Sequence, residues 1–184
     1  MRPAFDALFA IDDAMGEVVA QSTQPALGAI KLAWWRERLE ELDQGKVPAE
    51  PRLQAAANEL LSRGLRGSDL AALEDGWLAL LEQPINAGRA SDRGAILFGL
   101  AARLIADPAP DLAGAGRLYA QGSLRRRGVE LAGVEQNPVQ PVSVRFRCLT
   151  GLAALAKRDL HHREPEGTPA RAWTLFRHRL TGRV

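Results

Sequence analysis

Three carboxylates that could hold a metal ion stand close together near the start of the chain: Asp12, Asp13 and Glu17. Asp13 and Glu17 are four residues apart, so a helix would place them one turn apart on the same face. Magnesium prefers oxygen ligands, and carboxylates at this spacing can chelate the ion or bridge it to a diphosphate. The alternative is an acidic face that water solvates, which is common on surface helices. A magnesium site of this kind also needs a second acidic cluster on a facing helix, and the sequence contains no such motif.

Arginines gather in two parts of the second half of the chain. Such concentrations can bind a diphosphate, nucleic acid or an anionic membrane. One is the run Arg125–Arg127, and the other is a C-terminal set made of Arg163, Arg171, Arg177, Arg179 and Arg183.

An apolar stripe accompanies the C-terminal arginines. Trp173, Phe176 and Leu180 are three and four residues apart, so they share one face of a helix. That pattern fits both a helix that lies in a membrane interface and a terminal helix docked on the core. We predict docking, because amphipathic helices are the norm in globular proteins.

The elements that must position these side chains are predicted to be helices. Alanine and leucine dominate, β-branched residues are few, and no strand-like alternation is sustained. Hydrophobic residues make up 46% of the chain and charged residues 25%, with a formal net charge of +2, as in a soluble globular protein. No apolar run reaches the roughly 18 residues of a membrane span, no signal peptide is visible, and the lone cysteine, Cys148, fits a reducing compartment. The predicted location is the cytoplasm.

About eight helices are expected, forming a single all-α domain over residues 1–184. Proline suits the first turn of several of them, and Ser68 and Ser91 are expected to cap two others. The predicted helices span 3–20, 25–44, 52–63, a segment from 68, a segment from 91, 112–131, 142–162 and 168–180.

Two N-terminal segments carry a resemblance to a known family. Residues 7–11 (Ala-Leu-Phe-Ala-Ile), preceded by Arg2, and residues 32–37 (Leu-Ala-Trp-Trp-Arg-Glu) resemble the squalene/phytoene synthase family in both composition and order. The resemblance implies the isoprenoid-synthase fold, a helical bundle around a central cavity, here without the family's first helix. It also implies that Phe9 and Trp34 line the cavity. The arginines that it points to for diphosphate binding are Arg2, Arg125, Arg126 and Arg127.

The chain departs from the two aspartate-rich motifs that hold magnesium in active members of that family. Aligning residues 7–11 with the family's apolar segment puts Gly16 and Glu17 at the paired aspartates and Ala20 at the third. Sliding the register to use Asp12 and Asp13 instead leaves Gly16 in place of the third ligand. At the second motif the chain has Ser123 and the arginine run, which would repel magnesium.

Three functions remain open on this basis. The first is a catalytically degenerate relative that acts in binding or assembly, like the respiratory-complex assembly factor that also resembles these synthases. The second is an active head-to-head prenyl-diphosphate transferase that uses magnesium at Asp12, Asp13 and Glu17. The third is a peripheral membrane or lipid-binding protein at the inner face of the membrane. Expected partners are therefore a prenyl diphosphate, a lipid or a membrane-enzyme subunit, and nucleic acid is not expected.

Overall fold

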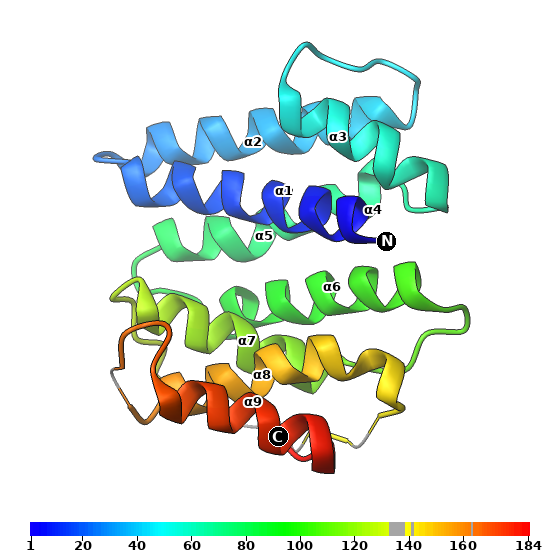
Figure 1. Cartoon of the computed structure of the whole chain (residues 1–184). Coiled ribbons are helices and arrows are strands. Elements are labelled where there is room, and N and C mark those ends of the chain that lie inside the picture. Colours follow the sequence, from blue (N-terminus) through cyan, green and yellow to red (C-terminus); the bar gives the residue numbers. More distant parts are fainter. Residues whose placement is uncertain (133–138, 141, 163) are drawn as a thin grey trace. The chain divides into compact units, whose positions relative to one another are not determined.

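The computed structural model describes residues 1–132, 139–140, 142–162 and 164–184, so Arg163 lies outside the described residues. In these ranges the chain forms helices joined by turns, with no strand, which confirms the predicted all-α fold (Figure 1). One predicted helix, from Ser68, is divided into the short helices α4 and α5. The helices are α1 (Arg2–Gln21), α2 (Pro25–Leu42), α3 (Pro51–Glu59), α4 (Gly67–Ala71), α5 (Leu73–Leu78), α6 (Ala87–Ile105), α7 (Ala113–Arg126), α8 (Arg147–Asp159) and α9 (Pro169–Thr181), and the short 3-10 turns are η1 (Leu61–Arg63), η2 (Ala79–Leu81) and η3 (Val144–Phe146).

The chain divides into two compact units, which we call the N-terminal unit (Met1–Arg93) and the C-terminal unit (Gly94–Val184). The division falls inside α6, so one helix contributes to both. Whether residues 1–184 fold as the single domain expected from the sequence stays a prediction.

In the N-terminal unit, α1 packs against α2, α3 and α5, and α2 also packs against α4 and α5. Prolines occupy the first turns of α1, α2 and α3, where a missing backbone N–H leaves no hydrogen bond unmade. The interior is filled by aliphatic side chains and by two tryptophans. Its most buried members are Leu8, Ile11, Met15, Leu32, Leu39, Leu53, Leu70 and Trp77.

The turn after α2 is tied to the start of α4 by a carboxylate. Asp43 accepts hydrogen bonds from the backbone N–H groups of Gly67, at 2.5 Å, and Ser68, at 2.9 Å. Partial burial opposes ionisation of Asp43, but these N–H groups outweigh it and lower the pKa of the carboxyl. Gly67 permits the approach, because a Cβ there would lie 1.9 Å from the carbonyl oxygen of Leu39.

The orientation of α2 places Trp34 at the surface, which corrects the cavity-lining position that the family resemblance implied for it. Leu27, Ile30 and Trp34 are exposed, with Ile30 at 66%, whereas Trp35 packs inward and is 8% exposed. The interior position expected for Trp34 is thus occupied by Trp35, whose ring meets that of Trp34 edge-on. Adjacent helical residues point about 100° apart, so a tryptophan pair must send one ring toward the surface.

In the C-terminal unit, α8 packs against both α7 and α9. Glycines of α6 and α7 make close contacts between helices. A Cβ at Gly94 of α6 would lie 1.9 Å from the carbonyl oxygen of Gly116, and one at Gly122 would lie 2.6 Å from Cα of Ala156. These helices therefore approach to backbone contact, which only glycine allows.

The start of α6 lies earlier than predicted. Ser91 is buried inside the helix, so it does not cap it. The side chain of Asn86 instead accepts a hydrogen bond from the backbone N–H of Arg89 at 3.1 Å, at the beginning of the helix.

The way α9 docks corrects a prediction. The inward face centres on His178, which is 2% exposed, and not on the aromatic stripe. The ring Nδ1 of His178 donates to the carbonyl oxygen of Arg183 at 2.8 Å, and Nε2 lies 3.0 Å from the hydroxyl of Thr150 on α8. The stripe of Trp173, Phe176 and Leu180 faces away from the unit, with exposures of 63%, 51% and 65%.

The contact between α6 and α7 can be tested with two glycines of one helix. Gly94→Ala should lower the free energy of unfolding by about 2 kcal/mol or more, because the new methyl group meets backbone that must move. Gly99→Ala is the matched control, since nothing lies within 4 Å of a Cβ there, and it should raise the free energy by up to about 1 kcal/mol. Urea denaturation checks both, and equal effects would contradict the close contact.

Candidate functional site

Asp12 lies in the interior of the N-terminal unit, where it is 3% exposed. Its Oδ1 accepts a hydrogen bond from Nε1 of Trp77 on α5 at 2.9 Å, and its Oδ2 pairs with the guanidinium of Arg93 on α6. Arg93 is 1% exposed, and its guanidinium carbon lies 4.0 Å from the centre of a Trp77 ring. The three side chains form a buried group in which the carboxylate, the cation and the indole each contact the other two. We call it the Asp12 cluster.

A close approach of α5 and α6 makes the Asp12 cluster possible. Gly76 lies against α6, because a Cβ there would be 2.4 Å from Cβ of Arg93 and 2.8 Å from the carbonyl oxygen of Arg89. The missing side chain at Gly76 lets the adjacent Trp77 lie beside Arg93. Asp12 then reaches both from α1.

The other two candidate metal ligands point elsewhere. Asp13 is exposed on the outside of α1. Glu17 pairs with Arg52 of α3 at 2.9 Å, and both side chains are partly exposed. Asp12 and Asp13 diverge because consecutive helical residues point about 100° apart.

The three carboxylates as placed do not form a magnesium site. Both oxygens of Asp12 already accept hydrogen bonds from N–H groups, so a cation would have to displace a guanidinium. No group of three or more His, Cys, Asp or Glu side chains in the described ranges is arranged to hold a metal ion. These three carboxylates therefore do not fit the magnesium chemistry that the family resemblance implies.

The candidate arginines are divided between the two units. Arg2 lies at the surface of α1 and pairs with Asp6 at 3.7 Å. Arg125 pairs with Glu130 at 2.9 Å in the C-terminal unit. Phe9, expected to line a cavity, is half-buried on α1.

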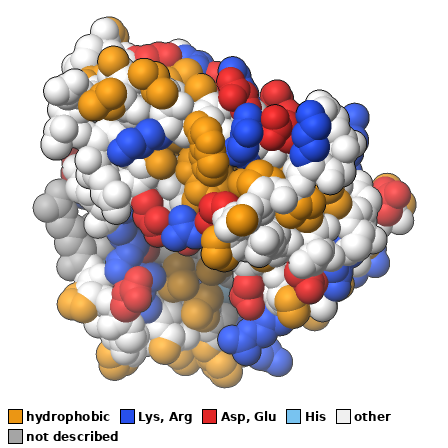
Figure 2. Space-filling model, turned by 90° about the horizontal axis from the view of Figure 1, so that it is seen from above, with side chains coloured by type: hydrophobic (Ala, Val, Ile, Leu, Met, Phe, Trp, Pro, Cys, Tyr) orange, Lys and Arg blue, Asp and Glu red, His pale blue; other side chains and the backbone are white. Residues whose placement is uncertain are grey.

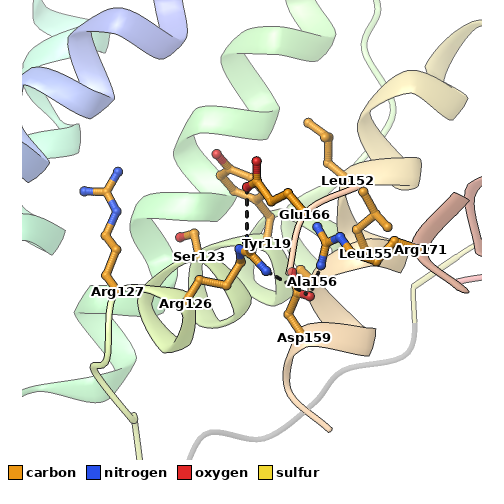
Figure 3. A pocket seen from close by; sticks show the side chains of 10 residues that line it. All are labelled: Tyr119, Ser123, Arg126, Arg127, Leu152, Leu155, Ala156, Asp159, Glu166 and Arg171. Carbon is orange, nitrogen blue, oxygen red and sulfur yellow. Dashed lines mark hydrogen bonds and ion pairs between the residues drawn. The ribbon is translucent and has the colours of Figure 1, made fainter. Parts of the chain in front are cut away.

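Arg126 and Arg127 line a hollow of about 360 Å³ between α7, α8 and the segment that leads into α9 (Figure 3). Arg126 pairs with Glu166 at 3.1 Å and with Asp159 at 3.6 Å, and Arg171 also pairs with Asp159. Asp159 is 5% exposed, so two guanidinium groups neutralise a buried carboxylate. Figure 3 shows the guanidinium of Arg127 pointing away from this group.

Both polar and apolar side chains line the hollow. Tyr119 and Ser123 of α7 lie near Arg126, and Leu152 and Leu155 of α8 lie on the side of Arg171 (Figure 3). Its three arginines exceed its two carboxylates by one, so the charged side chains of the lining carry one net positive charge. Two of these arginines, Arg126 and Arg171, already hold carboxylates.

Sequence reasoning missed the partners of Asp12 and one further buried carboxyl group. Glu74 of α5 is 5% exposed, and its burial raises the pKa of the carboxyl, although Arg36 partly opposes the shift. The sequence offered one usable signal. Arg93 directly precedes the apolar run 94–102, where an arginine on a buried helix needs a partner.

Comparisons with known proteins assign no family. No protein-family model, curated protein or solved structure matches the chain. The likeness to squalene/phytoene synthases stays an expectation from the sequence. Among the described residues, no helix is both long and apolar enough to cross a bilayer.

The role of Asp12 can be tested by isosteric substitution. Asp12→Asn should lower the free energy of unfolding by about 3 kcal/mol, because it leaves the buried Arg93 cation without its carboxylate. Asp13→Asn is the neighbouring control, and its exposed position predicts a change within about 0.5 kcal/mol. Denaturant titration at neutral pH measures both. A small, equal effect would show that Asp12 is not held in a buried ion pair.

The neighbouring carboxyl groups of Glu74 and Asp75 should change the stability of the fold in opposite directions as pH rises. The folded pKa of Glu74 is raised by burial above 4.5, so its contribution to stability is intact below that pH and is lost as pH rises through the folded pKa. Glu74→Gln should therefore raise the melting temperature at neutral pH, with the gain vanishing below about pH 4.

Asp75 is the matched control for this test. Its hydrogen bond from Arg89 lowers its pKa below 3.8, so it stabilises the fold above that value and loses this contribution as pH falls. Asp75→Asn should lower the melting temperature at neutral pH. Shifts of the same sign in both variants would contradict the assignment.

Proposed function

We propose that this chain is a catalytically degenerate relative of the squalene/phytoene synthases that acts in binding or assembly. The precedent is the respiratory-complex assembly factor that resembles the same family. The observation that carries the proposal is the Asp12 cluster, because a carboxylate that the second register offers to magnesium is committed to an arginine and a tryptophan. Glu17, which the first register puts at the family's paired aspartates, is likewise paired with Arg52.

The loss of catalysis follows from the chemistry that the family uses. Departure of a diphosphate requires cations to neutralise the charge that develops on it. An Asp12 neutralised by Arg93 has no charge to offer to magnesium. At the place of the second motif, Arg126 is paired with Asp159 and Glu166.

A role in binding is supported by the exposed apolar face of α2. Leu27, Ile30 and Trp34 are exposed at 50%, 66% and 42% and recur at helical spacing. Figure 2 views the molecule from the side of α2 and α3 and shows apolar side chains among acidic and basic ones. Exposed aromatic and aliphatic side chains with a charged rim are typical of protein docking surfaces. Glu37 and Glu41 beside this face pair with Arg38, at 3.6 and 3.1 Å, so the rim carries both signs of charge, which suits a protein partner better than an anionic membrane.

Ligand binding separates this proposal from an active transferase. Adding magnesium with a non-hydrolysable farnesyl diphosphate analogue at millimolar concentration should leave the melting temperature unchanged. A functional site occupied at a hundred times its Kd would stabilise the fold by about 2.7 kcal/mol, which is readily measured. A shift in the native protein that Asp12→Asn abolishes would favour the transferase instead.

Partner capture tests the docking face of α2. The tagged chain should recover subunits of a respiratory or other membrane enzyme from extracts of its host, and Ile30→Asp should abolish their recovery. Gln54→Asp, which adds the same charge to an exposed position of α3, should leave recovery intact. Recovery of no such subunit, or equal recovery with both variants, would contradict the proposal.

A further inference from the structure

The outward face of α9 is an apolar stripe that the described residues of the C-terminal unit leave exposed. Trp173, Phe176 and Leu180 are exposed at 63%, 51% and 65%, and the rings of Trp173 and Phe176 lie 5.5 Å apart between centroids. The helix is anchored from its opposite side, where His178 contacts Thr150. The stripe is therefore held outward by the docking of the helix itself.

Basic side chains flank this stripe. Arg177 and Arg179 lie on opposite sides of it, and Arg183 follows the helix. Residues 168–184 contain four arginines and no aspartate or glutamate. Within the described part of the chain, the guanidinium groups of Arg177 and Arg179 make no ion pair, so both are available to an external anion.

The basic surface continues from α9 onto α8. A hollow of about 210 Å³ beside α9 is lined by Lys157, His161, His162, Arg177 and Arg183. Lys157 donates to the carbonyl oxygen of Val184 at 3.2 Å, and Arg177 and Arg183 add further positive charge. The hollow lies on the Arg177 flank of the stripe, so an apolar surface and a basic hollow adjoin on one side of the unit.

The charges beside the α9 stripe indicate which kind of partner binds it. A second copy of α9 would bring arginines against arginines, which is repulsive. The exposed stripe of α2 differs, because residues 25–42 carry as many acidic as basic side chains and Arg38 pairs with Glu37 and Glu41. An outward apolar face containing Trp and Phe with arginines on both flanks is the pattern of a helix that lies in the interface of an anionic bilayer.

We propose that the outward face of α9 binds the surface of an anionic phospholipid membrane. Trp173, Phe176 and Leu180 enter the interfacial region, and Arg177, Arg179 and Arg183 contact lipid phosphates. The helix lies along the membrane without crossing it. This inference does not depend on the proposed assembly role, because it rests on a different helix in a different unit.

Vesicle sedimentation with the full chain tests the proposal. The chain should bind vesicles of phosphatidylcholine mixed with phosphatidylglycerol and should not bind phosphatidylcholine alone. The triple variant Trp173→Gln, Phe176→Gln, Leu180→Gln should weaken binding about tenfold or more. Arg177→Gln with Arg179→Gln should reduce both the affinity and its dependence on salt.

The apolar stripe of α2 supplies a matched control. Leu27→Gln, Ile30→Gln, Trp34→Gln removes a similar exposed apolar surface and should leave vesicle binding unchanged. Equal loss in both triple variants would overturn the proposal, as would native chain that fails to bind phosphatidylglycerol vesicles. An α9 triple variant that binds as tightly as native protein would show adsorption by charge alone and would also overturn it.

Tryptophan fluorescence gives a second readout that needs only one conservative substitution. Lipids brominated near the headgroup should quench tryptophan fluorescence on vesicle binding, and Trp173→Phe should remove most of that quenching. Quenching that persists in Trp173→Phe would place a different tryptophan in the lipid and contradict the proposal. A vesicle-free dimer that the α9 triple variant dissociates would identify a second copy as the occupant and overturn it too.

Discussion

A charged group can be held in a protein interior only if another charge or several hydrogen bonds compensate for the lost water. In the N-terminal unit this constraint fixes how three helices meet. Asp12 of α1 is neutralised by Arg93 of α6, and Trp77 of α5 donates to the carboxylate and stacks under the guanidinium. Removing any one member leaves another without compensation, so the registers of α1, α5 and α6 are coupled through this group.

The same constraint explains why acidic residues that look alike in the sequence differ in their burial and in their ion-pair partners. Asp12 is buried with Arg93, while Glu17 pairs with Arg52 near the surface. In the C-terminal unit, Asp159 is buried between Arg126 and Arg171. Both units thus use buried carboxylates to hold arginines. The oxygens of these buried carboxylates are therefore occupied by arginine side chains.

The sequence predicted the helices well because composition and local signals determine them. Prolines at Pro3, Pro25 and Pro169 mark real first turns, and the all-α class followed from abundant alanine and leucine. Orientation was harder. For α9 and α2, the sequence showed which residues share a face, but the contacts of His178 and Trp35 decide which face turns inward. The partner of Asp12 lies 81 residues away, and no local pattern specifies a contact at that separation.

The central claim is that the carboxylate of Asp12 is a structural partner of Arg93, and a double-mutant cycle tests it most directly. The free energies of unfolding of native protein, Asp12→Asn, Arg93→Met and the double variant give the coupling between the two side chains. The account predicts a coupling of about 2 kcal/mol or more, with the double variant more stable than the sum of the single losses implies. Effects that are additive within about 0.5 kcal/mol would contradict the structural role of Asp12 and would leave it a candidate metal ligand.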